Sequence, residues 1–513
     1  MRIKQNAVVC IGILFAFLII AIGTATALET PAEEWNKTFG GTSTENTKSV
    51  QQTTDGGYIL AGPTNSFGAG GHDAWLIKTY ANGTEEWNKT FGGTDLDDAE
   101  SVQQTLDGGY ILAGHTVSFG AGSNDAWLIK TYANGTEEWN KTFGGTDLDD
   151  DQSVQQIPDG GYILAGSTNS FDAGSNDAWL IKTYANGTEE WNKTFGGTDL
   201  DDAESVQQTS DGGYILAGYT VSFGGGGYDA WLIKTYANGT EEWNKTFGGT
   251  NTDDAESVQQ IPDGGYILAG STNSFGAGSN DAWLIKTYAN GTEEWNKTFG
   301  GTSTDDAESV QQTLDGGYIL AGSTNSFGAG SNDAWLIKTY ANGTEEWNKT
   351  FGGTSTDVAE SVQQTTDGGY ILTGYLYSFG AGDYDAWLIK IEPPTLECQN
   401  INIKPDEINT KTKFINAYME LPDSYSVEDI DVSTVTLTNE DLFDSPVYAF
   451  GKTKIGDYDK NGVPDLKVKF GVLGLNPVPE GEYICTVEGE LVNEQKFKGT
   501  DTITIVTKGK KQK

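Results

Sequence analysis

The stretch DYDKNGVPDL, residues 457–466, has the residue types and spacing of a calcium-binding loop. Oxygen-bearing side chains alternate along it and Gly462 permits a sharp turn, as at the start of an EF-hand loop. Position twelve is Val468 instead of a bidentate glutamate, so another acidic side chain or water must complete the shell. The alternative is an ordinary Asn-Gly hairpin with solvated carboxylates. The expected Ca²⁺ ligands are Asp457, Asp459, Asn461, the carbonyl of Val463, and Asp465.

Residues that could support catalysis are few. His72 and His115 are the only histidines, they occur in different repeats, and the sequence has no zinc-binding spacing. Carboxylate pairs for glycoside chemistry are conceivable because acids are abundant, but no acid stands out. A nearly perfect repeat also provides no single asymmetric site. We therefore expect no catalytic residues.

The first 27 residues resemble a secretory signal. Arg2 and Lys4 precede an apolar run, and Ala25–Ala27 reads as a small-residue cleavage site. An uncleaved anchor is the alternative, although the run is slightly shorter than the ~20 residues of a membrane span. No second apolar run follows, so we expect a secreted chain without a transmembrane span.

Three cysteines are present. Cys10 lies within the apolar leader, whereas Cys398 and Cys485 lie near the C-terminus. An even pair in an exported chain favours one disulfide between Cys398 and Cys485. The alternative is two buried free thiols.

A repeat of 52 residues provides the framework for these groups. The octapeptide DGGYILAG starts at Asp55 and recurs at this spacing, and all 14 tryptophans fall into two series with the same period. Such a repeat indicates a solenoid, a propeller or an array. Two tryptophans per unit at constant strand positions favour packing between units over exposed stacking surfaces.

Each unit contains four segments of strand type. In the first complete unit they are SVQQT, YILAG, DAWLIKTY and EEWNKTF, joined by hairpin-length links that include Asn82-Gly83. If Asn82-Gly83 is a two-residue turn, Lys78 pairs with Trp87 in a cross-strand cation–π contact. Four-stranded units of this length predict an all-β, seven-bladed β-propeller over residues 33–392. A parallel β-helix is the alternative, but its strands are not joined by Asn-Gly hairpins.

The ends of the repeat region are offset by one strand. The region begins with the fourth strand alone, Glu33–Phe39, and ends with the third, Asp385–Glu392. The N-terminal strand can therefore complete the last blade and close the ring. A linear solenoid would need polar caps instead.

The segments EWNKTFGG, SVQQTxDGGYILAG and DAWLIK resemble those of secreted propeller-repeat proteins of archaea and bacteria. The resemblance covers Glu33–Glu392 and implies architecture, because propellers carry many unrelated activities. The glycine pairs are faintly similar to kelch repeats. However, the kelch order of glycine pair, tyrosine and tryptophan is absent, and so is a galactose-oxidase ligand set.

Two loops per unit vary while the strands stay constant. They follow the fourth and second strands, and in a four-stranded meander both emerge on the same rim, which is the expected binding face. Unconstrained drift of exposed loops is the alternative, and solvated carboxylates are favoured over a second set of Ca²⁺ sites. The candidate ligand residues are His72, Asp95, Asp97, Asp98, His115, Asp125, Tyr219, Tyr228, Tyr375 and Tyr384.

Formal N-glycosylation sequons recur in every unit. The NGT motif is equally explained by its hairpin turn, and NKT by strand packing with Asn88 opposite Ile77. The candidate acceptors are Asn36, Asn82, Asn88, Asn134, Asn140, Asn186, Asn192, Asn238, Asn244, Asn290, Asn296, Asn342 and Asn348.

A different pattern follows the repeats. Residues 395–507 contain strand-like runs and turns typical of a small β-sandwich, and residues 508–513 form a basic tail. The stretch STVTLTN…IGDYDKNGVPDLKVKF…GTDTITIV resembles an accessory module found in secreted archaeal and bacterial proteins, which implies context but no activity.

The net charge of −42 argues against a nucleic-acid partner. We therefore expect an exported, non-catalytic, cell-surface propeller that binds a glycan or a protein partner. A structural component of the cell envelope and a polysaccharide hydrolase or lyase are the alternatives. Ca²⁺ is the only expected cofactor.

Overall fold

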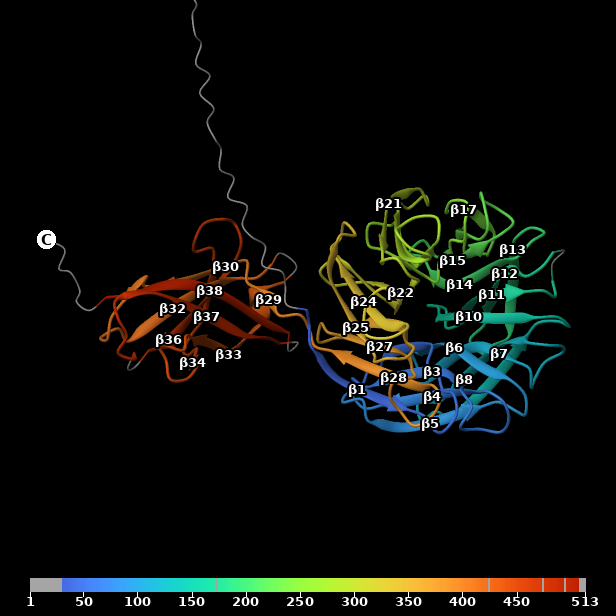
Figure 1. Ribbon diagram of the computed structural model, residues 1–513, viewed down its shortest axis with the longest axis horizontal. Helices are drawn as coiled ribbons and strands as arrows, with labels where there is room; N and C mark the ends of the chain where they lie inside the picture. The colour runs from blue at the N-terminus through green and yellow to red at the C-terminus, as the bar shows by residue number, and fades with distance from the viewer. Residues whose placement is uncertain (1–29, 172–173, 423–424, 473–474, 493–494, 507–513) are drawn as a thin grey trace, which may run out of the picture.

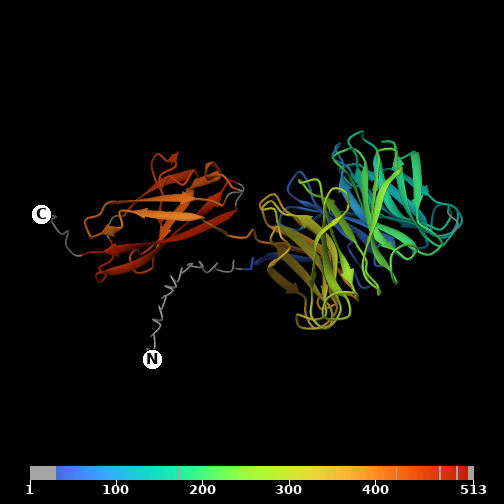
Figure 2. The same ribbon diagram turned by 90° about the horizontal axis from the view of Figure 1, so that it is seen from above.

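The computed structural model describes residues 30–171, 174–422, 425–472, 475–492 and 495–506. The expected leader (1–27) and basic tail (508–513) lie outside these ranges. The regular secondary structure of the described chain is almost entirely β-strand, arranged in a repeat unit and a C-terminal unit (Figures 1 and 2). Within the described ranges, no helix has the length and hydropathy needed to span a membrane.

Seven four-stranded antiparallel sheets make up the repeat unit, and we number them in chain order. The first strand of each sheet is innermost and the fourth is outermost. Their strands are, for sheet 1, β2 (Ser49–Gln52), β3 (Tyr58–Thr64), β4 (Asp73–Thr79) and β5 (Glu85–Phe91); for sheet 2, β6 (Asp97–Gln104), β7 (Tyr110–Thr116), β8 (Asp125–Thr131) and β9 (Glu137–Phe143); for sheet 3, β10 (Asp149–Gln156), β11 (Tyr162–Thr168), β12 (Asp177–Thr183) and β13 (Glu189–Phe195); for sheet 4, β14 (Asp201–Gln208), β15 (Tyr214–Thr220), β16 (Asp229–Thr235) and β17 (Glu241–Phe247); for sheet 5, β18 (Ser257–Gln260), β19 (Tyr266–Thr272), β20 (Asp281–Thr287) and β21 (Glu293–Phe299); for sheet 6, β22 (Asp305–Gln312), β23 (Tyr318–Thr324), β24 (Asp333–Thr339) and β25 (Glu345–Phe351); and for sheet 7, β26 (Asp357–Gln364), β27 (Tyr370–Leu376), β28 (Asp385–Ile391) and β1 (Glu33–Phe39).

Sheet 7 combines the two ends of the repeat region. Strand β1 pairs antiparallel with β28, with Asn36 opposite Ile389 and Phe39 opposite Ala386. The expected pairing of the N-terminal strand with the last repeat is thus confirmed. The hydrogen bonds of β1 satisfy the edge of β28 that would otherwise be unpaired.

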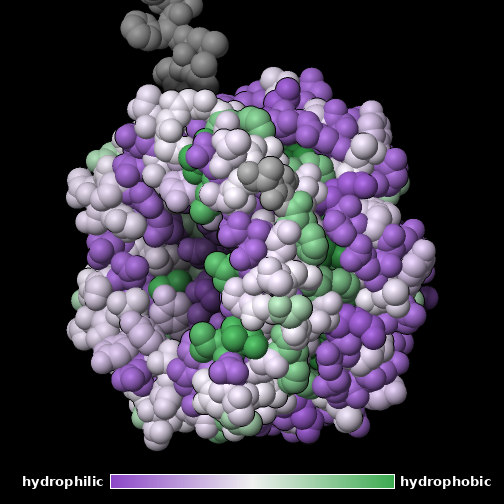
Figure 3. All heavy atoms as spheres, turned by 90° about the vertical axis from the view of Figure 1, so that its right-hand side faces the viewer, coloured by the Kyte–Doolittle hydropathy of each residue, from purple (hydrophilic) through white to green (hydrophobic). Residues whose placement is uncertain are grey.

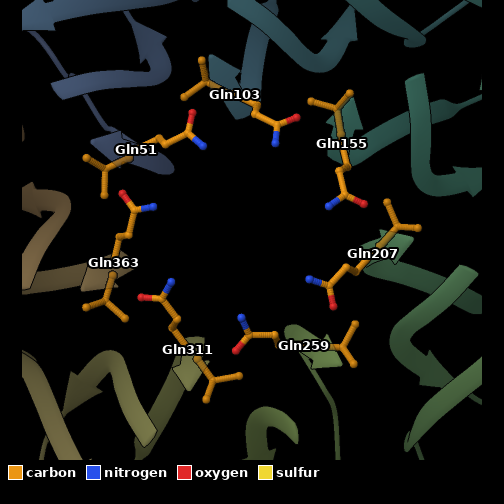
Figure 4. A pocket seen from close by; sticks show the side chains of 14 residues that line it. Gln51, Gln103, Gln155, Gln207, Gln259, Gln311 and Gln363 are labelled. Carbon is orange, nitrogen blue, oxygen red and sulfur yellow. The ribbon is translucent and has the colours of Figure 1, made fainter. Parts of the chain in front are cut away.

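The inner strands are linked around a central channel by one repeated hydrogen bond. The backbone N–H of Gln104 in sheet 2 donates to Oε1 of Gln51 in sheet 1 at 2.6 Å, and each later sheet repeats this contact. The last such bond, from Gln52 N–H to Gln363 Oε1 at 2.6 Å, joins sheet 1 to sheet 7. Figure 4 shows the seven glutamine amides around the channel. Each sheet contributes one valine and one glutamine to the channel lining.

Aromatic residues fill the space between neighbouring sheets. Trp75 and its equivalents are almost fully buried. Trp87 in sheet 1 packs edge-on against Tyr110 of sheet 2, with ring centroids 5.8 Å apart. The expected role of both tryptophan series in packing is confirmed. Burial of this apolar area is the main term that stabilises each sheet against its neighbour.

The DGG turns place an aspartate beside a buried lysine. Lys78 is 2% exposed, and its ammonium group donates to the carbonyl of Thr79 and pairs with Asp55 at 3.0 Å and Glu86 at 3.5 Å. A side chain at Gly57 would begin 2.1 Å from the Thr79 carbonyl oxygen, so only glycine fits there. The ammonium group therefore contacts carboxylates. The sequence instead predicts a contact with the ring of a tryptophan.

The ANGT hairpins are one residue longer than expected. The N–H of Tyr80 donates to the carbonyl of Thr84, and Gly83 has a φ of +75°, so the loop has three residues and ends in a glycine bulge. A register shift beside Lys78 then restores the expected pairing of Lys78 with Trp87.

The C-terminal unit consists of two sheets that enclose one hydrophobic cluster. A short 3₁₀-helix, η1 (Val427–Asp429), connects them. The strands are β29 (Leu396–Glu397), β31 (Glu407–Ile408), β33 (Ile430–Thr438), β34 (Val447–Tyr448), β37 (Gly481–Leu491) and β38 (Lys496–Ile505) in one sheet, and β30 (Asn400–Lys404), β32 (Phe414–Glu420), β35 (Lys454–Gly456) and β36 (Asp465–Gly471) in the other.

The disulfide prediction is wrong in this structure, because Cys398 and Cys485 are both free thiols. The N–H of Cys398 bonds to Lys498 on one side of β38, whereas Cys485 pairs with Asp501 on the other side. Strands on either side of a third are roughly 9–10 Å apart. A disulfide needs Cα atoms about 4.4–6.8 Å apart. Burial raises the pKa of both thiols to about 12, so both stay protonated at neutral pH.

Candidate functional site

One end of the channel carries an acidic mouth that is created by β-bulges. In sheet 2, Ala99 pairs with Gly114 and Ser101 with Ala113, so Glu100 is the extra, unpaired residue. A bulge re-aims its side chain. A Cβ atom at Gly114 would lie 2.2 Å from the carbonyl oxygen of Asp98, so glycine is needed opposite the bulge. This explains the last residue of the repeated YILAG segment.

We define the channel mouth as two tiers of side chains at this end of the inner strands. The tier next to the channel lining holds five glutamates, one lysine and one glutamine, and the outer tier holds five aspartates, one asparagine and one valine. The members are Lys48, Glu100, Gln152, Glu204, Glu256, Glu308 and Glu360, then Asn46, Asp98, Asp150, Asp202, Asp254, Asp306 and Val358.

The glutamates interact across sheets and strongly perturb one another. Burial, followed by repulsion from neighbouring carboxylates, raises the pKa of Glu204, Glu256 and Glu308 well above the ordinary range. In the outer tier, burial raises the pKa of Asp202 and Asp254 to about 6. Such a mouth can bind a cation, and it can exchange hydrogen bonds with a hydroxyl-rich ligand through protonated and ionised carboxyl groups.

Lys48 is the single cation of the inner tier. Its ammonium group donates to Glu360 at 3.0 Å, linking the first and last sheets. Burial lowers its pKa, but attraction to Glu360 and Glu100 outweighs burial and raises the pKa overall. The lysine therefore stays charged and offsets part of the acidic repulsion on that side of the mouth.

Two of the predicted ligand residues have a structural role. Asp97 is fully buried and accepts hydrogen bonds from the N–H of Gly93 and the hydroxyls of Ser118 and Thr116. Asp125 is 2% exposed and accepts the N–H of Ala121. Both carboxylates hold the glycine-rich loops in place and face away from solvent, so their placement on a binding face is wrong. Asp95 is exposed on its loop, as expected.

Both histidines converge on one carboxylate of the outer tier. His72 Nδ1 lies 3.1 Å from Asp98 Oδ1, and His115 Nε2 lies 3.6 Å from Asp98 Oδ2. His72 precedes β4 in sheet 1, whereas His115 and Asp98 belong to sheet 2. The two sheets thus build a cluster that the sequence separation does not reveal.

Tyrosines cluster at the mouth in sheets 4 and 7. The rings of Tyr219 and Tyr228 are nearly perpendicular with centroids 5.0 Å apart, and the Tyr219 hydroxyl donates to Asp202 at 3.2 Å. Tyr375 and Tyr384 form a second such pair at 5.2 Å. The predicted tyrosines therefore lie in two groups, and the group in sheet 4 is bonded to a carboxylate of the mouth. Figure 3 shows a face of the repeat unit on which hydrophilic and hydrophobic residues are mixed, with a hollow to the left of its centre.

The inner glutamate tier was missed by sequence reasoning. Glu100 and its equivalents stand in a strand whose alternation predicts one side-chain direction, and the bulge changes that direction. The substitutions at this position, lysine at 48 and glutamine at 152, are a usable signal. They interrupt a repeat that otherwise carries glutamate.

The candidate glycan acceptors fall into two environments. Asn82, at an exposed hairpin tip, accepts the N–H of Thr84 at 3.0 Å. Asn88 lies opposite Ile77, as expected, and its Nδ2 donates to Glu85 at 2.7 Å. Attachment of a sugar to Nδ2 disturbs less at the NGT tips than in the NKT strands.

The acidic loop of the C-terminal unit meets a third carboxylate. Oxygens of Glu420, Asp459 and Asp465 lie within 4.8 Å of one another. Glu420 comes from β32, and burial raises its pKa. Asn461 donates to Glu420 at 2.8 Å. Asp457 instead accepts the N–H of Gly462 and is not part of this group.

A pocket of about 260 Å³ adjoins these carboxylates. It is lined by Tyr418 and Tyr458 and by the asparagines Asn400 and Asn402. The buried Oδ1 of Asn402 has no hydrogen-bond partner among the described residues. The pocket thus offers another oxygen of the kind that Ca²⁺ prefers.

No family model matches the chain. The regulatory protein FlaEY of Caulobacter vibrioides is 24% identical over 250 residues, which are 43% of this chain and 26% of that protein. The chain therefore matches about a quarter of that protein's length.

Two solved structures illustrate the structural similarity. The extracellular domain of BT4673 from B. thetaiotaomicron is 10% identical, covering 94% of this chain and 59% of that chain, with a TM-score of 0.38. An endo-1,5-alpha-L-arabinanase from Thermotoga petrophila is 10% identical, covering 71% of this chain and all of that chain, with a TM-score of 0.29. Similarities this low carry no argument about function.

Proposed function

We propose that the chain is an exported, non-catalytic, seven-bladed β-propeller that recognises a glycan at the cell surface through its channel mouth. The circle of hydrogen bonds through seven sheets supports the propeller, and the leader pattern supports export. The observation that carries the function is the hydrogen bond of Tyr219 to the mouth carboxylate Asp202, beside the exposed ring of Tyr228. Aromatic faces and a few well-placed polar groups are the usual lining of small-ligand sites.

The two tyrosine groups lie on sheets 4 and 7 only, so they make the mouth asymmetric. A perfect repeat would lack this asymmetry. Tyr219 is fixed by its hydrogen bond to Asp202, and Tyr228 stands against it with 37% of its surface exposed. A sugar ring can stack on Tyr228 while its hydroxyls donate to Asp202. Tyr384 and Tyr377 offer a second surface on sheet 7, with ring centroids 5.2 Å apart.

Replacement of Tyr228 by alanine is expected to weaken glycan binding about tenfold, which corresponds to ~1.4 kcal/mol. The measurement is binding of the full chain to a glycan array, followed by titration of the best ligand. Tyr132→Ala is the matched control, because Tyr132 is 53% exposed at the opposite end of its sheet. Equal loss in both variants, or saturable binding to a surface protein only, contradicts a glycan site at the mouth.

A polysaccharide hydrolase or lyase is the second candidate. It is favoured by the carboxyl groups of Asp202 and Asp254, whose pKa values are raised to about 6, since a general acid near neutrality needs such a shift. Release of reducing ends that disappears in Asp202→Asn would establish it. If neither binding nor turnover is found, the chain is a structural component of the envelope.

We also propose that the C-terminal unit binds Ca²⁺ through Asp459, Asp465 and Glu420. Glu420 is the acidic side chain that completes the shell in place of a glutamate at Val468. Asn461 positions Glu420 through its amide, and the Val463 carbonyl remains a candidate ligand. Asp457 has the role of a turn residue in this arrangement.

Addition of 10 mM Ca²⁺ is expected to stabilise the C-terminal unit by about 1.4–2.7 kcal/mol, given a dissociation constant of ~0.1–1 mM typical of extracellular modules. Hydrogen exchange of β32 and β36, which border the site, reports the unfolding of this unit. Glu420→Gln should abolish the stabilisation, while Glu428→Gln, at an exposed position, should keep it. Equal stabilisation of both variants contradicts the site.

A further inference from the structure

Both histidines of the chain, His72 and His115, contact the mouth carboxylate Asp98. The described part of the mouth has no other imidazole group. His115, Asp98 and Glu100 offer ligand atoms that all lie within 4.8 Å of one another. His115 is 18% exposed at its side chain and Asp98 16%, so the group is largely shielded but open to the channel. Imidazole with carboxylates is a ligand set for divalent transition metal ions.

The distances suit a small tetrahedral ion. Bonds of about 2.0–2.2 Å from Zn²⁺ to nitrogen and oxygen place neighbouring ligand atoms roughly 3.3–3.6 Å apart. The distance between His115 Nε2 and Asp98 Oδ2 is 3.6 Å. Glu100, the bulge residue, offers a carboxylate oxygen within 4.8 Å of the ligand atoms of His115 and Asp98. Three protein ligands leave one position for water or for a bound ligand.

Neighbouring groups hold the ligands in orientation. His72 Nδ1 contacts the other oxygen of Asp98 at 3.1 Å and fixes that carboxylate. His115 Nδ1 faces Asp150 at 3.8 Å and has no hydrogen-bond partner among the described residues. A proton on Nδ1 is attracted by Asp150 and leaves the lone pair of Nε2 directed at the site. Such outer contacts tune the affinity of metal sites.

The site occurs once in the ring. At the position of His115 the other sheets carry serine, tyrosine or proline, and at the position of His72 most carry asparagine. Lys48 is held by Glu360 at 3.0 Å, and its charge also attracts Glu100.

We propose that Asp98, Glu100 and His115 form a binding site for one divalent transition metal ion of the Zn²⁺ type, with His72 as a positioning residue. The site does not depend on glycan binding, because its ligands all come from the chain. It gives the near-symmetric mouth one chemically distinct point between sheets 1 and 2.

The test is calorimetric titration of the chelator-treated full chain with ZnCl₂ in the presence of Ca²⁺, together with the visible spectrum of the Co²⁺-loaded protein. One equivalent of Zn²⁺ and a Co²⁺ spectrum of tetrahedral type are expected. His115→Ser, which copies sheet 3, should weaken Zn²⁺ binding at least 100-fold. His72→Asn, which copies the asparagine of sheet 2, should weaken it 10- to 100-fold.

Tyr219→Ser is the matched control, because it makes the equivalent change in sheet 4 and should leave the stoichiometry and affinity unchanged. Absence of Zn²⁺ binding overturns the proposal. So does Zn²⁺ binding that is equal in the wild type and His115→Ser, since the ion would then bind other carboxylates. Thermal unfolding of each variant without metal shows that the fold is retained.

Discussion

Replacing Asp151 with alanine is expected to stabilise the repeat unit by about 1–3 kcal/mol at pH 4, and by more as the pH rises. Asp151 is fully buried, with a relative exposure of 0%. Neither of its oxygens has a hydrogen-bond partner among the described residues. The equivalent position is alanine in most other sheets, for example Ala99, which packs in the apolar layer between sheets 1 and 2.

The pH dependence follows from the direction of the pKa shift. Burial, and then the charge of Asp150, raises the pKa of Asp151 well above its ordinary value. The folded chain therefore holds a proton that the unfolded chain loses above pH ~4. Wild-type stability then falls as the pH rises from about 4 toward the folded pKa. Asp151→Ala lacks this group, so its advantage over the wild type grows across the same range.

Urea unfolding followed by tryptophan fluorescence at pH 4, 6 and 8 measures this difference, because all 14 tryptophans lie in the repeat unit. Asp147→Ala is the control, since Asp147 is an exposed carboxylate just before the same strand and should change stability by less than about 0.5 kcal/mol. A destabilised Asp151→Ala variant, or an advantage that does not change with pH, would show that Asp151 is paired and charged in the folded protein.

Phe39→Ala is expected to cost about 3–5 kcal/mol of stability and to open the ring at one place. Phe39 is 8% exposed in the apolar cluster between sheets 7 and 1, together with Tyr58 and Leu388. It belongs to β1, which lacks the hairpin connection that every other fourth strand has to its third. Loss of this contact therefore releases β1 from β28 more easily than the same change releases an internal strand.

Phe143→Ala provides the comparison, because Phe143 has the same 8% exposure in the equivalent cluster between sheets 2 and 3. Hydrogen exchange should rise first in β1 and β28 for Phe39→Ala, and it should rise without such localisation for Phe143→Ala. The same exchange pattern in both variants would mean that the junction of sheets 7 and 1 is no weaker than the others.

The strands and their order could be predicted because each repeat has clear strand and turn patterns in its sequence. Apolar alternation, Asn-Gly links and the one-strand offset led to four-stranded sheets with β1 in the last one, and the structure has this pairing. The length of the ANGT loop was wrong by one residue, since a glycine bulge and a register shift compensate each other beside Lys78. Pattern alone does not distinguish such compensating irregularities.

The site was predicted less well, because its geometry depends on contacts between units. Asp97 has the loop position of a ligand residue, but its serine and threonine partners enclose it. Glu100 faces the channel only because of a bulge, which strand alternation does not reveal. Glu420 reaches the acidic loop from a distant strand, and Cys398 and Cys485 are separated by β38. Each of these depends on three-dimensional neighbours that sequence spacing leaves undetermined.

The pairing of β1 with β28 also has a consequence for synthesis on the ribosome. Strand β1 emerges before the six complete sheets, whereas its partner β28 (Asp385–Ile391) emerges only after they have been made. During this interval β1 is an open strand edge with half-buried aromatic residues, which is the kind of surface that pairs with other chains. Neighbouring nascent chains can thus exchange first strands before either ring is complete. The growing protein therefore depends on dilution or on a chaperone until its last repeat is made.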